Sequence, residues 1–81
     1  MNTAAGIAQV RIDHLNKLMR ALGRGTVYFL RTDGRVKEIT TLGHVFFYDA
    51  KELPDMIAER ERQLVERSAR AIDRSGLRVS S

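Results

Sequence analysis

Few side chains in this sequence have the chemistry of a catalytic or metal-binding site. Cysteine is absent, which excludes disulfides, thiolate zinc ligands and cysteine nucleophiles. The two histidines, His14 and His44, are too few for a histidine-rich metal site. Serine first occurs at residue 68, so a serine nucleophile with a base and an orienting carboxylate has no natural place in the chain. The sequence therefore predicts a protein that is not an enzyme and that holds no cofactor or metal.

Two short segments contain parts of a ligand site without completing one. The glycine pair at residues 23–25 lies between a predicted helix and a predicted strand, the reverse of the order in a dinucleotide-binding loop. His44, Asp49 and Glu52 form a local group of possible metal ligands. However, Asp49 and Glu52 have the spacing of a helix capping box, which favours a structural role for both carboxylates.

The formal charge of +4 is distributed unevenly along the chain. Residues 1–37 hold seven basic and two acidic side chains, residues 38–58 hold one and four, and residues 59–81 hold six and four. Eleven of the 14 basic residues are arginine, which pairs through two hydrogen bonds with carboxylate and phosphate groups alike. This pattern is compatible with an acidic protein surface or a nucleic acid as partner, and also with an ordinary solvated surface.

Residues 26–49 are the stretch around which the rest of the chain is predicted to fold. Asp33-Gly34 separates two runs rich in β-branched and aromatic residues, a strong hairpin signal because this pair accepts the backbone angles of a tight turn. Leu42-Gly43 is a weaker turn signal, and all five aromatic side chains fall within the stretch. The sequence predicts a three-stranded antiparallel meander with strands at residues 26–32, 35–41 and 44–48.

Helices are predicted before and after this meander. Apolar residues recur with the 3.6-residue period of an amphipathic helix over residues 3–22 and again over residues 50–75. Because a helix rises 1.5 Å per residue, the second helix is longer than the sheet that precedes it. We therefore predict a single α+β domain over residues 1–81, in the order helix, three strands and long helix, with a short tail at 76–81.

The predicted register assigns the strand residues to two faces of the sheet. Two-residue loops at both turns would gather one apolar set on a first face: Val27, Phe29, Val36, Val45 and Phe47. The second face would hold Tyr28, Leu30, Ile39, Phe46 and Tyr48, edged by Lys37 and His44. Since tyrosine hydroxyls need a partner or water, we expect the helices to cover the first face and leave the second open. The alternative places one helix on each face.

An open sheet face with aromatic side chains predicts a binding surface. We expect the partner contact to centre on Tyr28, Phe46 and Tyr48, with basic residues at its rim: Arg31, Arg35 and Lys37. The alternative surface lies on the far half of the second helix, at Arg60, Arg67 and Arg70. The open face and the long helix together predict a homo-oligomer, such as a homodimer, and contact with another protein. Nucleic acid, held by arginine and by bases stacked on aromatic rings, is the alternative partner.

The sequence contains no recognisable targeting or anchoring segment. Its N-terminus lacks the basic start and apolar run of a signal peptide, and no apolar run approaches the roughly 20 residues of a membrane span. We therefore expect a soluble protein of the cytoplasm that has no membrane partner.

Three segments of the chain resemble the small head–tail joining protein W family of lambda-type phages. They are residues 15–19 in the first predicted helix, residues 32–35 at the first turn, and residues 52–59 at the start of the second helix, and the resemblance spans roughly residues 12–65. It implies a small phage or prophage protein that acts by contact. With the open face, this predicts a virion assembly factor or an inhibitor of a host or defence protein.

Overall fold

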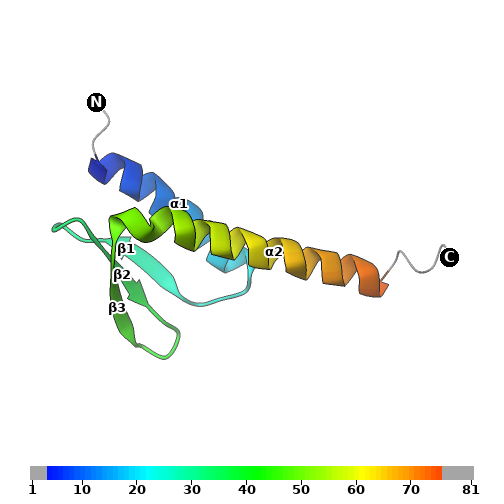
Figure 1. The fold of residues 1–81 in the computed structure, drawn as a ribbon. Helices are drawn as coiled ribbons and strands as arrows, with labels where there is room; N and C mark the ends of the chain where they lie inside the picture. The colour runs from blue at the N-terminus through cyan, green and yellow to red at the C-terminus, as the bar shows by residue number, and fades with distance from the viewer. Residues whose placement is uncertain (1–3, 76–81) are drawn as a thin grey trace.

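The computed structural model of the chain describes residues 4–75, with side chains up to residue 70. The elements are α1 (Ala4–Ala21), β1 (Val27–Leu30), β2 (Arg35–Ile39), β3 (Val45–Asp49), the 3₁₀ turn η1 (Ala50–Glu52) and α2 (Leu53–Ser75) (Figure 1). The predicted α+β order of helix, three strands and long helix is confirmed. The predicted tail at 76–81, and residue 3 at the predicted helix start, lie outside the described residues.

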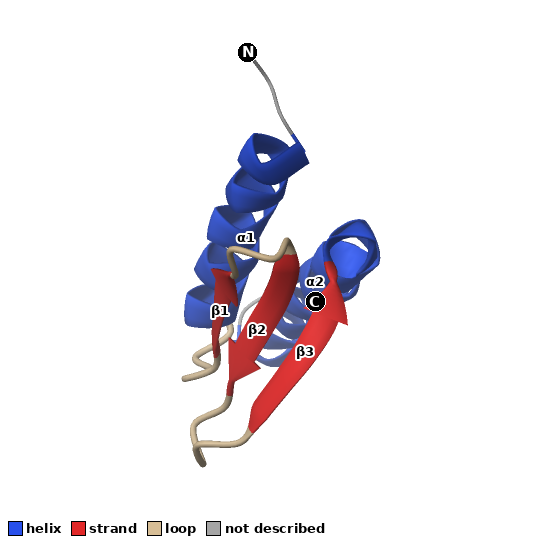
Figure 2. Ribbon diagram, turned by 90° about the vertical axis from the view of Figure 1, so that its left-hand side faces the viewer, coloured by secondary structure: helices blue, strands red, loops and turns tan. Residues whose placement is uncertain are grey.

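The three strands form one antiparallel sheet in the order β1-β2-β3, and both helices lie on the same side of it (Figure 2). The arrangement with one helix on each face is therefore excluded. Asn16 of α1 fixes the helix against the edge strand β1. Its side-chain N–H donates to the Tyr28 carbonyl oxygen at 3.0 Å, and its side-chain oxygen accepts the Tyr28 backbone N–H at 2.9 Å. Backbone groups at the outer edge of β1 are thus paired with α1 instead of being left exposed.

Both turns contain three residues, so the predicted two-residue loops are wrong. Beside the first turn, the Arg31 N–H donates to the Arg35 carbonyl oxygen at 2.8 Å, and the Gly34 N–H donates to the Arg31 carbonyl oxygen at 3.0 Å. The second turn repeats this pattern between Thr40 and His44, with the Gly43 N–H bonded to the Thr40 carbonyl oxygen at 2.9 Å. Each turn is therefore a tight turn closed by a glycine bulge.

The backbone angles explain why the three-residue form is adopted. A two-residue turn of the common type needs a positive φ at both central residues. Gly34 and Gly43 have φ of 85° and 86°, but no residue other than glycine has a positive φ within residues 4–75. Asp33 and Leu42 therefore stay in ordinary backbone regions, and one further residue completes each loop.

The longer turns change which way β2 faces. Val36 now lies opposite Leu30 and Tyr48, and Lys37 lies between Phe29 and Phe47. Each turn shifts the register by one residue, and the two shifts cancel between β1 and β3. Because neighbouring side chains on a strand point to opposite sides, each β2 side chain lies on the face opposite to the predicted one. The side chains of β1 and β3 keep their predicted grouping.

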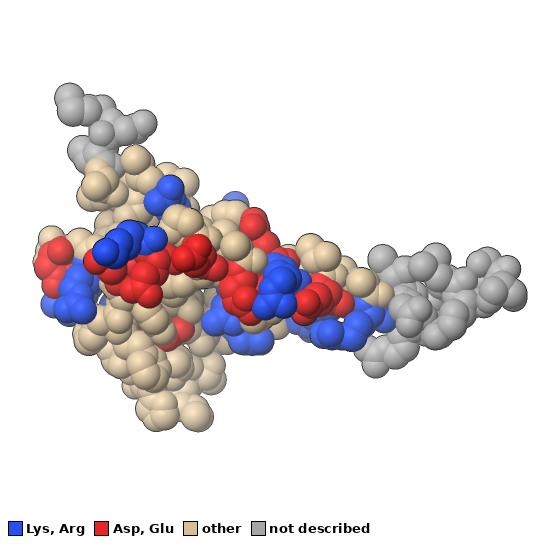
Figure 3. All heavy atoms as spheres, viewed as in Figure 1, with Lys and Arg blue, Asp and Glu red and all other residues tan. Residues whose placement is uncertain are grey.

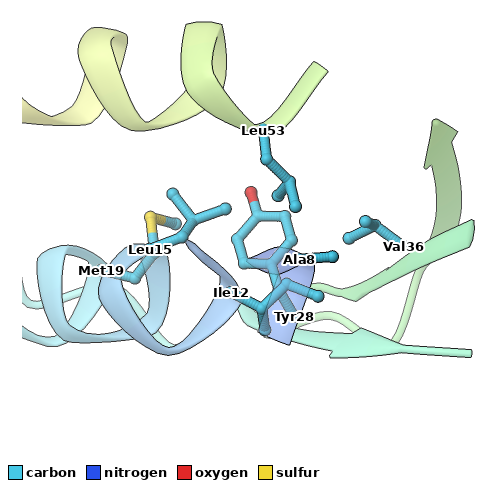
Figure 4. Close-up of a cluster of buried hydrophobic side chains, with 7 residues drawn as sticks. All are labelled: Ala8, Ile12, Leu15, Met19, Tyr28, Val36 and Leu53. Atoms are coloured by element: carbon cyan, nitrogen blue, oxygen red, sulfur yellow. The ribbon is translucent and has the colours of Figure 1, made fainter. Parts of the chain in front are cut away.

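The helices cover the face that carries the tyrosines, so the prediction that they cover the Val/Phe face is wrong. This covered face consists of Tyr28, Leu30, Val36, Glu38, Phe46 and Tyr48. The buried cluster consists of Ala8, Ile12, Leu15, Met19, Tyr28, Val36 and Leu53. Figure 4 shows the Tyr28 ring lying between side chains of α1 and Leu53 of α2. The physical reason is that Tyr28 has a hydrogen-bond partner inside the protein, Glu38, and needs no water.

The predicted capping box, Asp49 and Glu52, forms at the start of the 3₁₀ turn η1, which leads directly into α2. The Asp49 side chain accepts the Lys51 N–H at 3.1 Å, and the Glu52 side chain accepts the Asp49 N–H at 3.0 Å. From there α2 runs beyond the end of the sheet (Figure 1). Within the described part of the chain, neither helix combines the length and the apolar character needed to cross a bilayer.

Candidate functional site

The sheet face turned away from the helices carries large apolar side chains without cover. We call it the open face. Its residues form three rows across the strands: an aliphatic row of Val27, Ile39 and Val45; a phenylalanine row of Phe29, Lys37 and Phe47; and an arginine row of Arg31, Arg35 and Asp49. Phe29 is 48% exposed and Phe47 43% exposed, whereas Tyr28 on the other face is 2% exposed.

The basic side chains of the open face are only partly neutralised. The Arg31 guanidinium lies 4.9 Å from the centre of the Phe47 ring and 3.5 Å from the Asp33 carboxylate. Lys37 is half-buried between the two phenylalanines, which offer no hydrogen-bond acceptor. Within residues 4–70, neither Lys37 nor Arg35 forms a side-chain ion pair. The open face therefore presents apolar surface together with cations that lack a fixed partner.

The covered face also carries a charge, but that charge is satisfied internally. The Glu38 carboxylate is 8% exposed and accepts hydrogen bonds from the Tyr28 hydroxyl and, at 2.7 Å, from the Tyr48 hydroxyl. Burial, as the largest cause, and the hydrogen bonds to Glu38 together raise the pKa of Tyr28 and of Tyr48 to about 12. Both phenols therefore stay neutral donors across the physiological range.

A shallow pocket of about 280 Å³ lies beside this cluster. Its lining is Tyr28, Glu38, Tyr48, Asp55, Met56, Glu59 and Arg60. The Arg60 guanidinium is bonded to Gln63 at 3.1 Å, and Glu59 accepts from Arg62 and Gln63. No buried side-chain nitrogen or oxygen within residues 4–70 lacks a hydrogen-bond partner. The hydrogen bonds of Arg60 and Glu59 thus stay within α2, and those of Glu38 stay within the sheet. Within the described residues, no group of three histidine or acidic side chains is arranged to hold a metal ion.

The six residues predicted as the partner surface do not lie on one surface. Tyr28 is in the core and Tyr48 is half-buried, since both hydroxyls reach Glu38. Phe46 belongs to the covered face by its register but is 48% exposed. The three predicted rim residues, Arg31, Arg35 and Lys37, all belong to the open face. The apolar residues beside them were predicted to share a face covered by the helices, so they were missed as a binding surface. Only three-residue loops at both turns place Glu38 beside Tyr28 and Tyr48, which allows the tyrosine face to be buried instead.

The alternative basic surface on α2 is also divided. Arg60 is half-buried and faces the pocket described above. Arg67 donates to the Leu22 carbonyl oxygen at 2.7 Å, which closes the end of α1. Arg70 is exposed. At least one of the three arginines therefore has a structural role.

The end of the β2–β3 hairpin is uncharged. Residues 39–48 contain no acidic or basic side chain apart from His44. Leu42 at the turn is 83% exposed. Figure 3 shows charged side chains gathered along α2, whereas the lower, projecting end of the molecule shows none on this side. The apolar surface of the open face thus continues to the tip of the hairpin.

Comparisons of the chain with protein-family models, with curated proteins and with solved structures found no match. Function is therefore inferred from the surface and its chemistry. The open face combines exposed aromatic and aliphatic side chains with unpaired cations, and this is the composition of a binding surface.

Proposed function

We propose that this protein is a non-enzymatic binding protein that docks another protein on its open face. The observation that supports this is the exposure of Val27, Phe29, Val45 and Phe47, each between 41% and 48%, on one side of a sheet. A solvated sheet face is normally polar, and an apolar patch with a polar rim marks an interaction site.

The size of the patch indicates how far the contact extends. The four side chains form one half-exposed apolar patch, and the largest such patch on a typical monomer covers about 300–600 Å². A stable protein interface buries about 800 Å² on each partner. The contact would therefore extend from these residues onto the arginine row and toward Leu42 at the hairpin tip.

The resemblance to the head–tail joining family supports a setting for this contact. A phage or mobile-element protein in the cytoplasm of a host cell would use the open face in virion assembly or to block a host protein. Neither role needs a catalytic group, which agrees with the internally bonded polar groups on the covered face.

Selection of binders against the immobilised protein tests the proposal. A displayed library of small domains and peptides is selected on the intact chain, and the selected binders are measured on the double variant Phe29→Ser/Phe47→Ser. Binding should fall at least tenfold because the centre of the patch is lost. Val10→Ser, which removes an exposed apolar side chain from α1, is the control and should leave binding unchanged. Binders whose affinity is the same for the double variant as for the parent protein would contradict the proposal.

Nucleic acid is the second candidate, because Phe29 and Phe47 flank Lys37 and could stack unpaired bases. The aliphatic row gives bases no stacking platform, and the cations occupy one end of the face, so a phosphate backbone could not follow them. A salt titration with single-stranded DNA separates the candidates. Phosphate contacts give log K a slope of about −0.7 for each contact, and no binding at about 50 mM salt leaves protein as the partner.

Self-association is a separate proposal that uses a different surface. Beyond the sheet, α2 exposes an apolar strip of Leu64, Val65, Ser68 and Ala69, and Val65 is 67% exposed. A second copy could cover this strip as a homodimer. Light scattering at about 100 μM should then give a dimer mass, since a complex with a micromolar Kd is largely formed there. Val65→Glu should return the protein to a monomer, and a strictly monomeric parent protein would contradict the proposal.

A further inference from the structure

The open face changes in character along its strands. At the hairpin-tip end lies the aliphatic row, in the middle Lys37 lies between two phenylalanines, and at the other end lie two arginines beside Asp49. A surface of this kind is amphipathic in the direction of the strands, so it can distinguish one end of a bound segment from the other.

The cations at one end need acceptors from the partner. The Asp33 carboxylate forms an ion pair with Arg31, whereas Arg35 and Lys37 form no ion pair with any carboxylate of the described residues. Covering Lys37 with apolar groups alone would remove its water and supply no hydrogen bond, which is strongly unfavourable. A partner that covers the phenylalanine row must therefore bring carboxylates to Lys37 and the arginine row.

A second copy of the chain does not meet this requirement in either simple face-to-face arrangement. If a two-fold axis runs parallel to the strands along β2, each row meets the same row with β1 and β3 exchanged. Arg31 then faces Asp49 of the second copy, but Arg35 faces Arg35 and Lys37 faces Lys37. If the axis runs across the strands at the middle row, Lys37 meets Lys37 of the second copy. Both arrangements place like charges opposite each other, which is destabilising.

The dimensions of the face fit a helix. Neighbouring rows are two residues apart, so three rows span about 14 Å along the strands. A helix covers that length in about nine or ten residues. The same sheet already packs two helices on its other side, and a helix on the open face would complete a third layer (Figure 2).

Building on the proposed function, we infer that the open face binds an acidic amphipathic helix of another protein. The helix lies along the strands, with its apolar stripe on the phenylalanine and aliphatic rows. Its carboxylates lie at one end, against Arg31, Arg35 and Lys37.

Two designed peptides of about 14 residues, long enough to cover the three rows, test this inference. They share one apolar helical stripe, and one carries three glutamates at an end where the other carries three lysines. Fluorescence anisotropy on the intact protein should show at least tenfold tighter binding of the acidic peptide at about 50 mM salt, with a smaller difference at about 500 mM. NMR amide shifts should concentrate at Phe29, Lys37 and Phe47.

Charge reversal on the face provides the matched comparison. Arg35→Glu/Lys37→Glu should reverse the preference and favour the basic peptide. Lys17→Glu/Arg20→Glu makes the same charge change on exposed residues of α1 and should preserve the preference for the acidic peptide. Equal binding of both peptides, or no binding of either, would overturn the inference.

The experiments distinguish a failure of the acidic-helix inference from a failure of the proposed function. If library-selected binders need Phe29 and Phe47 but ignore Arg35→Glu/Lys37→Glu, the protein-binding face stands and the acidic helix is overturned. If neither Phe29→Ser/Phe47→Ser nor Arg35→Glu/Lys37→Glu changes the affinity of the selected binders, both proposals fail. Anionic phospholipid vesicles and single-stranded DNA are measured in parallel. Tighter, face-dependent binding to either one than to the acidic peptide would also overturn the inference.

Discussion

The two faces of the sheet both combine aromatic rings with a charged residue of β2, yet one is core and the other is exposed. On the covered face, Tyr28 and Tyr48 donate their hydroxyl hydrogens to Glu38. On the open face, Phe29 and Phe47 flank Lys37 and can accept no hydrogen bond from it. The difference between the faces is therefore one of hydrogen-bond matching, since each face carries five large aliphatic or aromatic side chains.

A buried charge is tolerated when its hydrogen-bond partners are buried in the same core. A carboxylate needs donors, and phenols supply them while their rings fill the core. An ammonium group needs acceptors, and phenylalanine has none. The chain therefore buries the face whose polar groups satisfy each other and leaves the other face to water or a partner.

Truncating the neighbouring residues Tyr28 and Phe29 separates the two faces most sharply. Tyr28→Ala removes a side chain that is 2% exposed, so the free energy of unfolding should fall by about 3–5 kcal/mol. Phe29→Ala removes one that is 48% exposed and should lower it by less than about 1 kcal/mol. Urea denaturation measures both values. Similar losses would show that the open face contributes to the core as much as the covered one.

Alkaline pH should destabilise the covered face selectively. Folding raises the pKa of Tyr28 and Tyr48 from 10 to about 12, so as pH rises the unfolded chain loses these protons first. The stabilisation from these two groups is complete below pH 10 and is lost between pH 10 and 12. We expect a total loss of about 2–3 kcal/mol, which is less than the two shifts would give if added in full, because Tyr48 keeps contact with water.

Denaturation at a series of pH values, with phenolate absorbance recorded in parallel, measures this loss. The variant Tyr28→Phe/Tyr48→Phe is the control and should show a shallower decline over the same range. A decline as steep as in the parent protein would assign the effect to other groups.

Neutralising the two central charges should give unequal effects. Glu38→Gln keeps the side-chain shape but replaces one of the two acceptor oxygens with a donor, so stability should fall by about 1–3 kcal/mol. Lys37→Gln, one residue away on the open face, should change it by no more than about 0.5 kcal/mol. Thermal melting compares the two variants. A larger loss for Lys37→Gln would reverse the assignment of the faces.

The turn glycines keep β2 in the register that separates the faces. No atom lies within 4 Å of a Cβ placed on Gly34 or Gly43, so substitution there strains only the backbone. Gly34→Val and Gly43→Val should each lower stability by about 1–2 kcal/mol. Leu42→Val, at a residue without positive φ, should lie within about 0.5 kcal/mol of the parent protein in the same melting experiment.

The order and approximate limits of the elements could be predicted from the sequence because they depend on local signals. Apolar periodicity marks both helices, β-rich runs mark the strands, and Asp49 with Glu52 marks the start of the second helix. These features depend on neighbours in the chain and need no knowledge of the packed structure. Arg31, Arg35 and Lys37 were predicted at the rim of the tyrosine face, whereas the structure places them on the opposite, open face.

The turn lengths and the choice of covered face could not be predicted in the same way. A glycine at the end of a turn suits both two-residue and three-residue loops, and only the φ of the residue before it distinguishes them. The covered face depends on Glu38 meeting Tyr28 and Tyr48, a contact between three strands. A one-residue error in register assigns Glu38 to the wrong face and removes the reason to bury the tyrosines.

The two glycine-closed turns also limit where this gene can change in length. A codon added within a turn lengthens the loop and can leave every cross-strand pair in place, since hairpins also close through loops of four or five residues. A codon added or deleted within β2 would instead reverse the facing of every strand residue beyond it, bringing Lys37 in place of Glu38 beneath the helices. Among descendants of this sequence, length changes should therefore be found in the turns and not within the strands.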